Sequence, residues 1–279
     1  MKKAVHIWAA FFYLCITMKE LLVRTLSGAV LVALIIVCIM VSPWTCAALG
    51  LLIVAVGTFE MSRLQHIDDP RQVFLGELLA VGTYVLVALG VLNVMPYNGL
   101  MLLLPMLPFL FALFSTTTDF KSIAAFTFGS IAYLSVPCVL MVWMHELFSP
   151  KMLLLVFVLL WANDTFAYLT GKLLGKHKLS PRISPGKTIE GSLGGLLFTM
   201  VGVIVFSRCA DWLTLKAAVG MGLIAVVFGT LGDLCESMLK RQAGVKDSGR
   251  LIPGHGGILD RFDSVLFAVP FVFVYLLLL

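Results

Sequence analysis

The chain alternates long apolar stretches with short polar connections. Nine of these stretches approach the roughly 20 mainly apolar residues that a membrane-spanning helix requires. They cover residues 24–41, 43–62, 75–94, 97–114, 122–147, 150–174, 190–207, 214–240 and 260–278. Pro105 and Pro108 are expected to bend the fourth stretch. The pattern predicts an all-α, polytopic membrane protein with about nine transmembrane helices.

The composition agrees with this fold class. Hydrophobic residues make up 60% of the 279 positions and charged residues only 13%, against about a quarter in a soluble domain. A soluble core of this chain length cannot absorb so much apolar surface. Six cysteines stand singly in apolar surroundings, so we expect small buried side chains and not a disulfide framework.

The basic residues predict the orientation. With the N-terminus in the cytoplasm, 17 of the 20 lysines and arginines fall on the cytoplasmic side, and only Lys151, Arg208 and Lys216 fall outside. Cytoplasmic loops of membrane proteins carry such an excess. We therefore expect a multi-pass protein of the cell (inner) membrane with a cytoplasmic N-terminus.

The first residues form a separate unit in this interpretation. Two lysines precede a short apolar run, Ala4–Thr17, which imitates a signal peptide but lacks a clear cleavage site. Met18 offers a second start. We expect residues 1–18 to be an interfacial helix or the product of a mis-assigned start codon. Residues 19–147 would be transmembrane scaffold helices, and residues 148–279 the catalytic region.

Charge is concentrated in that last region: the 100 residues from Asp164 to Asp263 hold 20 of the 35 charged side chains. Ionisable groups within membrane helices are costly and usually functional. Asp164, Tyr168 and Lys172 are four residues apart and share one helical face. Downstream, Ser184 and Lys187 precede a helix N-terminus, a setting that suits phosphate. Gly186-Lys187-Thr188 matches the end of a P-loop, but the upstream glycine is missing and we reject that motif.

A second polar group surrounds a loop rich in glycine and proline. Asp233, Ser237, Lys240 and Arg241 form a stripe at i, i+4, i+7 and i+8, and Glu236 lies one step off it and is left out. Asp260 and Asp263 share a face where the last helix begins. The loop between can bring both helix ends together. Carboxylates next to basic residues suit Mg²⁺ and substrate phosphates.

These residues resemble a known signature. The segment from Ser237 to Asp263 is similar to that of the phosphatidate cytidylyltransferases, and no position departs from it. The matching residues are Ser237, Lys240, Arg241, Lys246, Asp247, Pro253, His255, Gly256, Gly257, Asp260, Arg261 and Asp263. The run around Asp164 and Lys187 also resembles that family, and the resemblance covers roughly residues 19–279.

The resemblance implies an enzyme that converts CTP and phosphatidic acid to CDP-diacylglycerol and pyrophosphate at the cytoplasmic face, with Mg²⁺ and, as an open question, a second, monovalent cation. Asp233, Asp260 and Asp263 are the predicted metal ligands. Asp233, Asp260, Lys187 and Lys240 are the predicted catalytic residues. The predicted substrate contacts are Lys172, Ser184, Ser237, Arg241, Lys246, His255 and Arg261. Glu190 and Asp247 are expected to orient lysines.

Three other classes remain as alternatives. A transporter would also carry intramembrane carboxylates, but it predicts charge in both halves of the chain. A related enzyme, such as a CTP-dependent lipid kinase or a transferase using another lipid phosphate, would share the signature. A purely structural subunit would not need this charge. The expected partners are CTP, phosphatidic acid and membrane lipid, with no nucleic acid, and a homodimer is left open.

Overall fold

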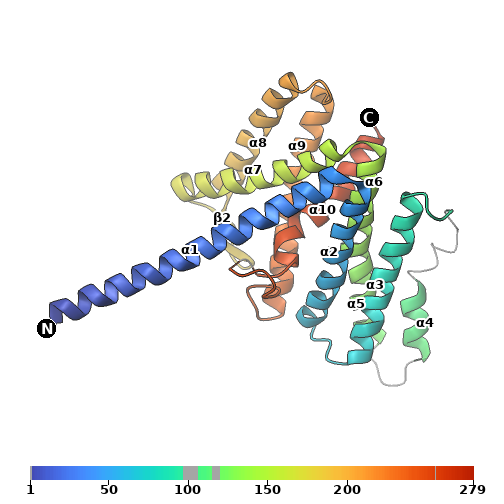
Figure 1. Ribbon diagram of the computed structural model, residues 1–279, viewed down its shortest axis with the longest axis horizontal. Coiled ribbons are helices and arrows are strands. Elements are labelled where there is room, and N and C mark those ends of the chain that lie inside the picture. Colours follow the sequence, from blue (N-terminus) through green and yellow to red (C-terminus); the bar gives the residue numbers. More distant parts are fainter. Residues whose placement is uncertain (1, 97–105, 115–119, 255) are drawn as a thin grey trace.

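The computed structural model describes residues 2–96, 106–114, 120–254 and 256–279. It consists of helices and one short hairpin (Figure 1). The helices are α1 Lys2–Val41, α2 Pro43–Leu64, α3 Pro70–Val91, α4 Leu107–Phe114, α5 Phe120–Ser130, the π-helical segment η2 Ile131–Ser135, α6 Val136–Leu147, α7 Pro150–Leu174, α8 Ile189–Cys209, α9 Leu215–Gln242 and α10 Leu259–Leu277. The strands are β1 Lys178–Ser180 and β2 Ser184–Thr188.

Seven helices in the described ranges are long and apolar enough to cross a membrane. They are Leu22–Val41, Pro43–Leu64, Pro70–Val91, Ala124–Leu147, Pro150–Leu174, Ile189–Cys209 and Leu215–Gln242. Each matches a predicted span. The predicted span 97–114 falls partly outside the described residues, and its described part is the eight-residue α4. The last predicted span is α10, a 19-residue helix with three charged residues near its start.

Side-chain caps define where several helices begin. A capping box between Ser42 and Thr45 separates α2 from α1. The hydroxyls of Ser149, Thr188 and Thr214 accept hydrogen bonds from the starts of α7, α8 and α9. Such caps satisfy backbone N–H groups that the first helical turn leaves without a partner. By contrast, α1 continues through residue 18 without a break and projects from the helix bundle (Figure 1).

Glycines bring the functional helices into close contact. A Cβ at Gly232 on α9 would lie 2.7 Å from the backbone oxygen of Asp263 on α10, and one at Gly191 on α8 would lie 2.7 Å from the backbone oxygen of Ala167 on α7. Gly195 extends the α7–α8 contact by one turn. Gly191 and Gly195 therefore serve helix packing, and the contact at Gly232 sets Asp233 close to α10.

The loops that follow α7 and α9 lie at one end of the bundle. The first contains the antiparallel hairpin of β1 and β2, in which Lys178 pairs with Thr188. The second is the α9–α10 loop, residues 243–258, which has glycines at positive φ and a backbone bridge between Ile252 and Gly256. Arg241 Nε donates to Ile183 O over 3.3 Å and so connects the two loops.

Candidate active site

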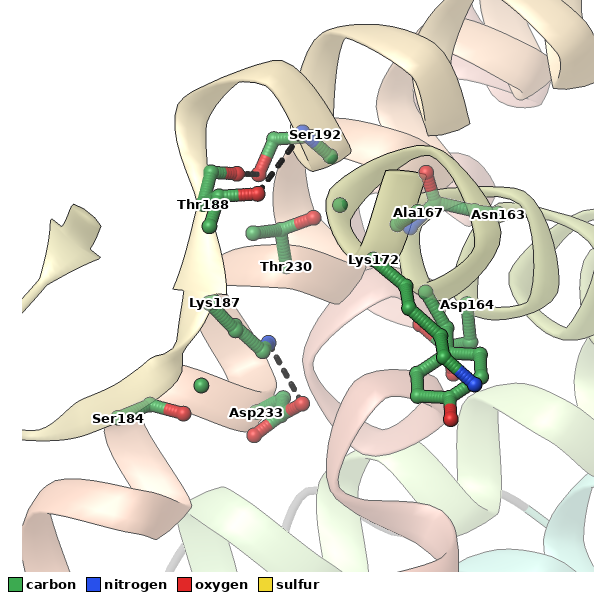
Figure 2. Close-up of a pocket in the computed structure, with 14 residues that line it drawn as sticks. Asn163, Asp164, Ala167, Lys172, Ser184, Lys187, Thr188, Ser192, Thr230 and Asp233 are labelled. Atoms are coloured by element: carbon green, nitrogen blue, oxygen red, sulfur yellow. Dashed lines mark hydrogen bonds and ion pairs between the residues drawn. The ribbon is translucent and has the colours of Figure 1, made fainter. Parts of the chain in front are cut away.

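A cavity of about 510 Å³ opens where α7, β2, α8 and α9 meet (Figure 2). Four predicted site residues line it: Lys172, Ser184, Lys187 and Asp233. They come from three elements, so the fold brings together side chains that are up to 61 positions apart in the sequence. The wall therefore combines basic and acidic groups with hydroxyls.

One wall of this cavity, the larger of two that predicted site residues line, is the polar face of α7. Asp164, Tyr168 and Lys172 all line it, which confirms that their spacing places them on one face. The ammonium of Lys172 lies 5.9 Å from the ring centroid of Tyr168, within cation–π range. Asp164 belonged to the sequence pattern but had been given no role, and its place in the wall makes it a site candidate.

An ion pair crosses the larger cavity. Lys187 Nζ lies 2.6 Å from Asp233 Oδ2, with 26% of the lysine side chain and 30% of the aspartate side chain exposed. Ser237 donates to the other oxygen, Asp233 Oδ1, over 3.1 Å. Because both charges reach the cavity, a polyanion entering it can compete with Asp233 for the lysine.

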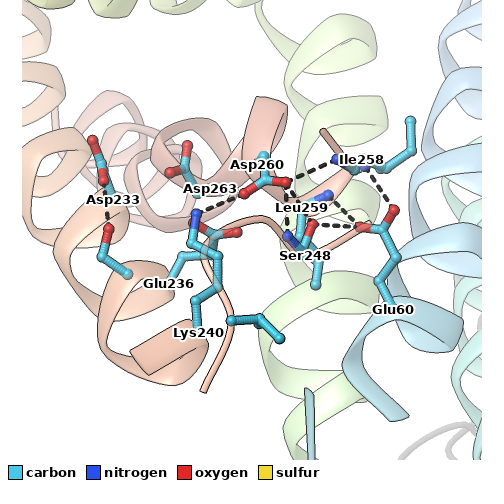
Figure 3. A network of polar contacts seen from close by, with 12 residues as sticks. Glu60, Asp233, Glu236, Lys240, Ser248, Ile258, Leu259, Asp260 and Asp263 are labelled. Carbon is cyan, nitrogen blue, oxygen red and sulfur yellow. Dashed lines mark hydrogen bonds and ion pairs between the residues drawn. The ribbon is translucent and has the colours of Figure 1, made fainter. Parts of the chain in front are cut away.

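A second ionic group lies deeper, at the junction of α9 and α10 (Figure 3). Lys240 Nζ is 2.5 Å from Glu236 Oε2 and 2.6 Å from Asp260 Oδ1. The side chains of Glu236 and Asp260 are 0% and 4% exposed. The exclusion of Glu236 from this polar group was therefore wrong, and its i, i+4 spacing from Lys240 was the signal that could have included it.

A smaller cavity of about 180 Å³ adjoins this region. It is lined by apolar residues of α1 and by Asp164, Asp260, Arg261 and Asp263. Asp164 also lines the larger cavity. Asp233 and Asp260 thus face different cavities, and Asp164 borders both. The smaller cavity has an apolar wall on one side and carboxylates with one arginine on the other.

The carboxylates were predicted to hold a cation. In the described part of the chain, no group of three or more histidine, cysteine, aspartate or glutamate side chains is placed to bind a metal ion. The ammonium groups of Lys187 and Lys240 instead lie against Asp233 and Asp260. The donors are carboxylate oxygens, which are ligands that Mg²⁺ accepts, and those of Asp233 and Asp260 already have an ammonium group beside them.

Of the other predicted residues, Arg241 and Lys246 line neither cavity. Arg241 donates to the backbone oxygens of Ile183 and Val245. Lys246 is exposed on the α9–α10 loop. His255 lies outside the described residues.

Glu190 differs from its expected role. Its carboxylate accepts from the backbone N–H groups of Lys176 and His177 and lies 2.6 Å from His177 Nδ1. It therefore holds the backbone that leads into the hairpin and does not orient a lysine ammonium. Its position in the first turn of α8, near the hairpin that precedes it, explains this contact.

Comparisons with known proteins agree with the signature. The sequence profile of the Cytidylyltransferase family matches residues 22–279. A phosphatidate cytidylyltransferase from Staphylococcus aureus (strain COL) is 45% identical over 157 residues, and one from Staphylococcus epidermidis (strain ATCC 12228 / FDA PCI 1200) is 44% identical over 161 residues. Each match covers 55% of this chain and 59% of the relative, so the chain spans about three fifths of the length of these proteins.

Proposed function

Since the chain belongs to the cytidylyltransferase family, we propose that it transfers the cytidylyl group of CTP to phosphatidic acid, giving CDP-diacylglycerol and pyrophosphate. The observation that carries the proposal is the larger cavity, which is lined by Lys172, Lys187 and the hydroxyl side chains of Tyr168, Ser184, Thr188, Ser192 and Thr230. These groups suit a polyphosphate, which lysines and hydroxyls bind through charge-assisted hydrogen bonds. The names of the matched relatives support phosphatidate as the acceptor.

The reaction requires positioning more than proton transfer. A phosphate oxygen of phosphatidic acid attacks the α-phosphorus of CTP, a new P–O bond forms, and the bond to the β-phosphate breaks with its electron pair leaving on pyrophosphate. The attacking oxygen is already an anion, so no covalent enzyme intermediate is needed. Lys187 and Lys172 would hold the phosphates in line and balance the charge that develops on the leaving group.

The acidic residues would bind Mg²⁺ in this proposal. Asp233, Asp260 and Asp263 come from α9 and α10, and Asp164 adds a fourth carboxylate from α7. When bound, the cation neutralises phosphate charge. The ion pair between Lys187 and Asp233 is partly exposed. If Mg²⁺ takes the place of the lysine ammonium beside Asp233, Lys187 is free to contact a substrate phosphate.

We further propose nine spans with a cytoplasmic N-terminus and the site at the cytoplasmic face. Support comes from the 17 to 3 distribution of basic residues. It also comes from Figure 1, in which α5 begins at the end of the bundle where α3 begins, while α4 lies beside α3. An additional crossing between α3 and α5 accounts for that arrangement.

The assay uses purified protein, radiolabelled CTP and phosphatidic acid in mixed micelles. We expect label to enter the lipid fraction with release of pyrophosphate, and we expect it to require Mg²⁺. An Asp211→Asn variant, which changes an exposed acid outside both cavities, should retain the activity. Absence of labelled lipid with every lipid phosphate offered would reject the enzyme. Product formed only with a different lipid phosphate would reject phosphatidic acid as the acceptor.

A further inference from the structure

Glu60 is a buried acid in the scaffold part of the chain. It lies on α2, is 3% exposed, and is the one acidic residue among positions 43–64 of the sequence. A buried carboxylate is costly unless hydrogen bonds compensate it. Figure 3 shows it facing the α9–α10 loop and the start of α10, which lie about 190 positions later in the chain.

Three donors from that distant segment surround the carboxylate. Ile258 N donates to Oε1 over 2.9 Å, Leu259 N donates to Oε2 over 2.9 Å, and Ser248 Oγ donates to Oε2 over 2.8 Å. Ile258 is the N-cap of α10, and its side chain makes no cap hydrogen bond. Glu60 therefore accepts, from another helix, backbone N–H groups at the N-terminus of α10 for which the N-cap side chain provides no acceptor.

The loop glycines fit the same carboxylate. A Cβ at Gly249 would lie 2.4 Å from Glu60 Oε1, and a Cβ at Gly257 would lie 2.4 Å from each oxygen of Glu60. Neither distance is tolerable for a carbon atom. The loop thus closes around Glu60 only because these two positions carry no side chain.

The contacts continue into the candidate site. Ser248 donates through its backbone N–H to Asp260 Oδ2 over 2.8 Å, and its hydroxyl lies 3.0 Å from the same oxygen. Gly257 N donates to that oxygen as well. The other oxygen of Asp260 accepts from Lys240. One short segment therefore lies between Glu60 and the pair of Asp260 and Lys240.

We propose that Glu60 is a positioning residue of the enzyme: it fixes the α9–α10 loop and the first turn of α10, and through Ser248 it sets the placement of Asp260 and Lys240. The inference rests on the proposed function. It assigns to the scaffold part of the chain a direct role in shaping the site, although Glu60 lines neither cavity.

The variant that tests this is Glu60→Gln. The amide keeps the size of the side chain but has a single acceptor oxygen, so one backbone N–H at the start of α10 loses its acceptor. Glu77→Gln is the matched control, because Glu77 lies on the neighbouring helix α3, outside this network. Ser248→Ala is a second variant for use if Glu60→Gln does not fold. It removes the contacts of the hydroxyl with Glu60 and Asp260 and leaves the cap of α10.

The first readout needs no catalytic activity. Trypsin can cut after Arg250 in the α9–α10 loop and after Arg182 in the hairpin, and both residues are exposed. We expect Glu60→Gln to increase cleavage after Arg250 on the order of tenfold or more, since a hydrogen bond to a charged group has been lost. Cleavage after Arg182 should not change. Equal cleavage after Arg250 in wild type, Glu60→Gln and Ser248→Ala would overturn the inference even if the wild type proved inactive.

The second readout is kinetic. We expect kcat to fall about 10²-fold with a smaller change in KM for CTP, because a displacement of about 1 Å costs that much. In an Asp260→Asn background the same change should add little, since both act on one unit. A purely structural Glu60 would lower the melting temperature and leave kcat per folded molecule unchanged, and that result would also overturn the inference. An inactive wild type would reject the proposed function, while the trypsin result would still decide the placement of the loop.

Discussion

Lys187 and Lys240 each pair with an aspartate at 2.6 Å, yet their surroundings differ. The first pair borders the larger cavity and is partly exposed, whereas Lys240 lies between two buried carboxylates. Exposed ion pairs add about 0–1 kcal/mol to stability. Removing one member of a buried pair costs about 3–5 kcal/mol because it leaves charge without compensation. The two ion pairs therefore have different roles, although their distances are the same.

Replacing each lysine by methionine separates these roles. Lys187→Met should leave the melting temperature close to that of the wild type while abolishing most of the cytidylyl transfer. Lys240→Met should lower the melting temperature and the yield of folded protein, because the charges of Glu236 and Asp260 lose their shared partner. Thermal unfolding in detergent, followed alongside turnover, checks both. A Lys187→Met protein with full turnover would remove that residue from the site.

Asp233→Asn tests the acidic side of the cavity. The change keeps the shape and removes the charge that faces Lys187, so the protein should fold while turnover falls about 10²–10³-fold, as for lost stabilisation of transition-state charge. The double variant with Asp260→Asn should be little worse than the worse single variant if both serve one cation. Effects that multiply would show that the two aspartates act independently, as their different cavities permit.

At the scale of elements, α7 and α8 pack along glycines that also shape the larger cavity. A Cβ at Gly195 would lie 2.9 Å from the backbone oxygen of Asn163 and 3.0 Å from Ala167 Cβ, so the two helices would have to separate. At Gly202, on the same helix, no heavy atom lies within 4 Å of the added carbon. The two positions form a matched pair for a packing test.

Gly195→Ala should destabilise the protein by about 1–3 kcal/mol, as overpacking does. Gly202→Ala should be neutral or stabilising by up to about 1 kcal/mol, because alanine favours the helix over glycine. Melting temperatures of the purified variants distinguish the two. A Gly195→Ala protein as stable as Gly202→Ala would show that the helices can move apart without cost.

The elements differ in how well the sequence predicted them. The long apolar runs determined seven spans, and regular spacing placed Asp164, Tyr168 and Lys172 on one face, because both patterns depend on local periodicity. The β1–β2 hairpin was missed, since its strands have three and five residues and one contains proline and glycine. Glu60 was missed for a different reason: its partners are about 190 positions away, and nothing local marks them.

At the scale of the whole molecule, the arrangement of the loops constrains the topology. The hairpin and the α9–α10 loop lie at one end, where Arg241 connects them. Ser27 on α1 donates to Pro253 O in the same region, over 3.0 Å. The segment between α8 and α9, which contains Asp211, follows a 21-residue helix that leads away from this end. We therefore expect a bilayer crossed by α8 to place Asp211 on the side opposite to both loops.

Cysteine labelling tests which side that is. In a background without the native cysteines, single changes Arg182→Cys, Arg250→Cys and Asp211→Cys place a thiol at three exposed positions. With an impermeant maleimide, intact spheroplasts should label only position 211, and inverted vesicles should label positions 182 and 250. The expected result follows from the 17 to 3 excess of basic residues on the loop side. It also follows from the proposed reaction, because CTP is a cytoplasmic substrate. Labelling of position 182 or 250 in intact spheroplasts would place the cavity on the outer face and contradict the proposed reaction. Labelling of all three positions from the same side would contradict the fold.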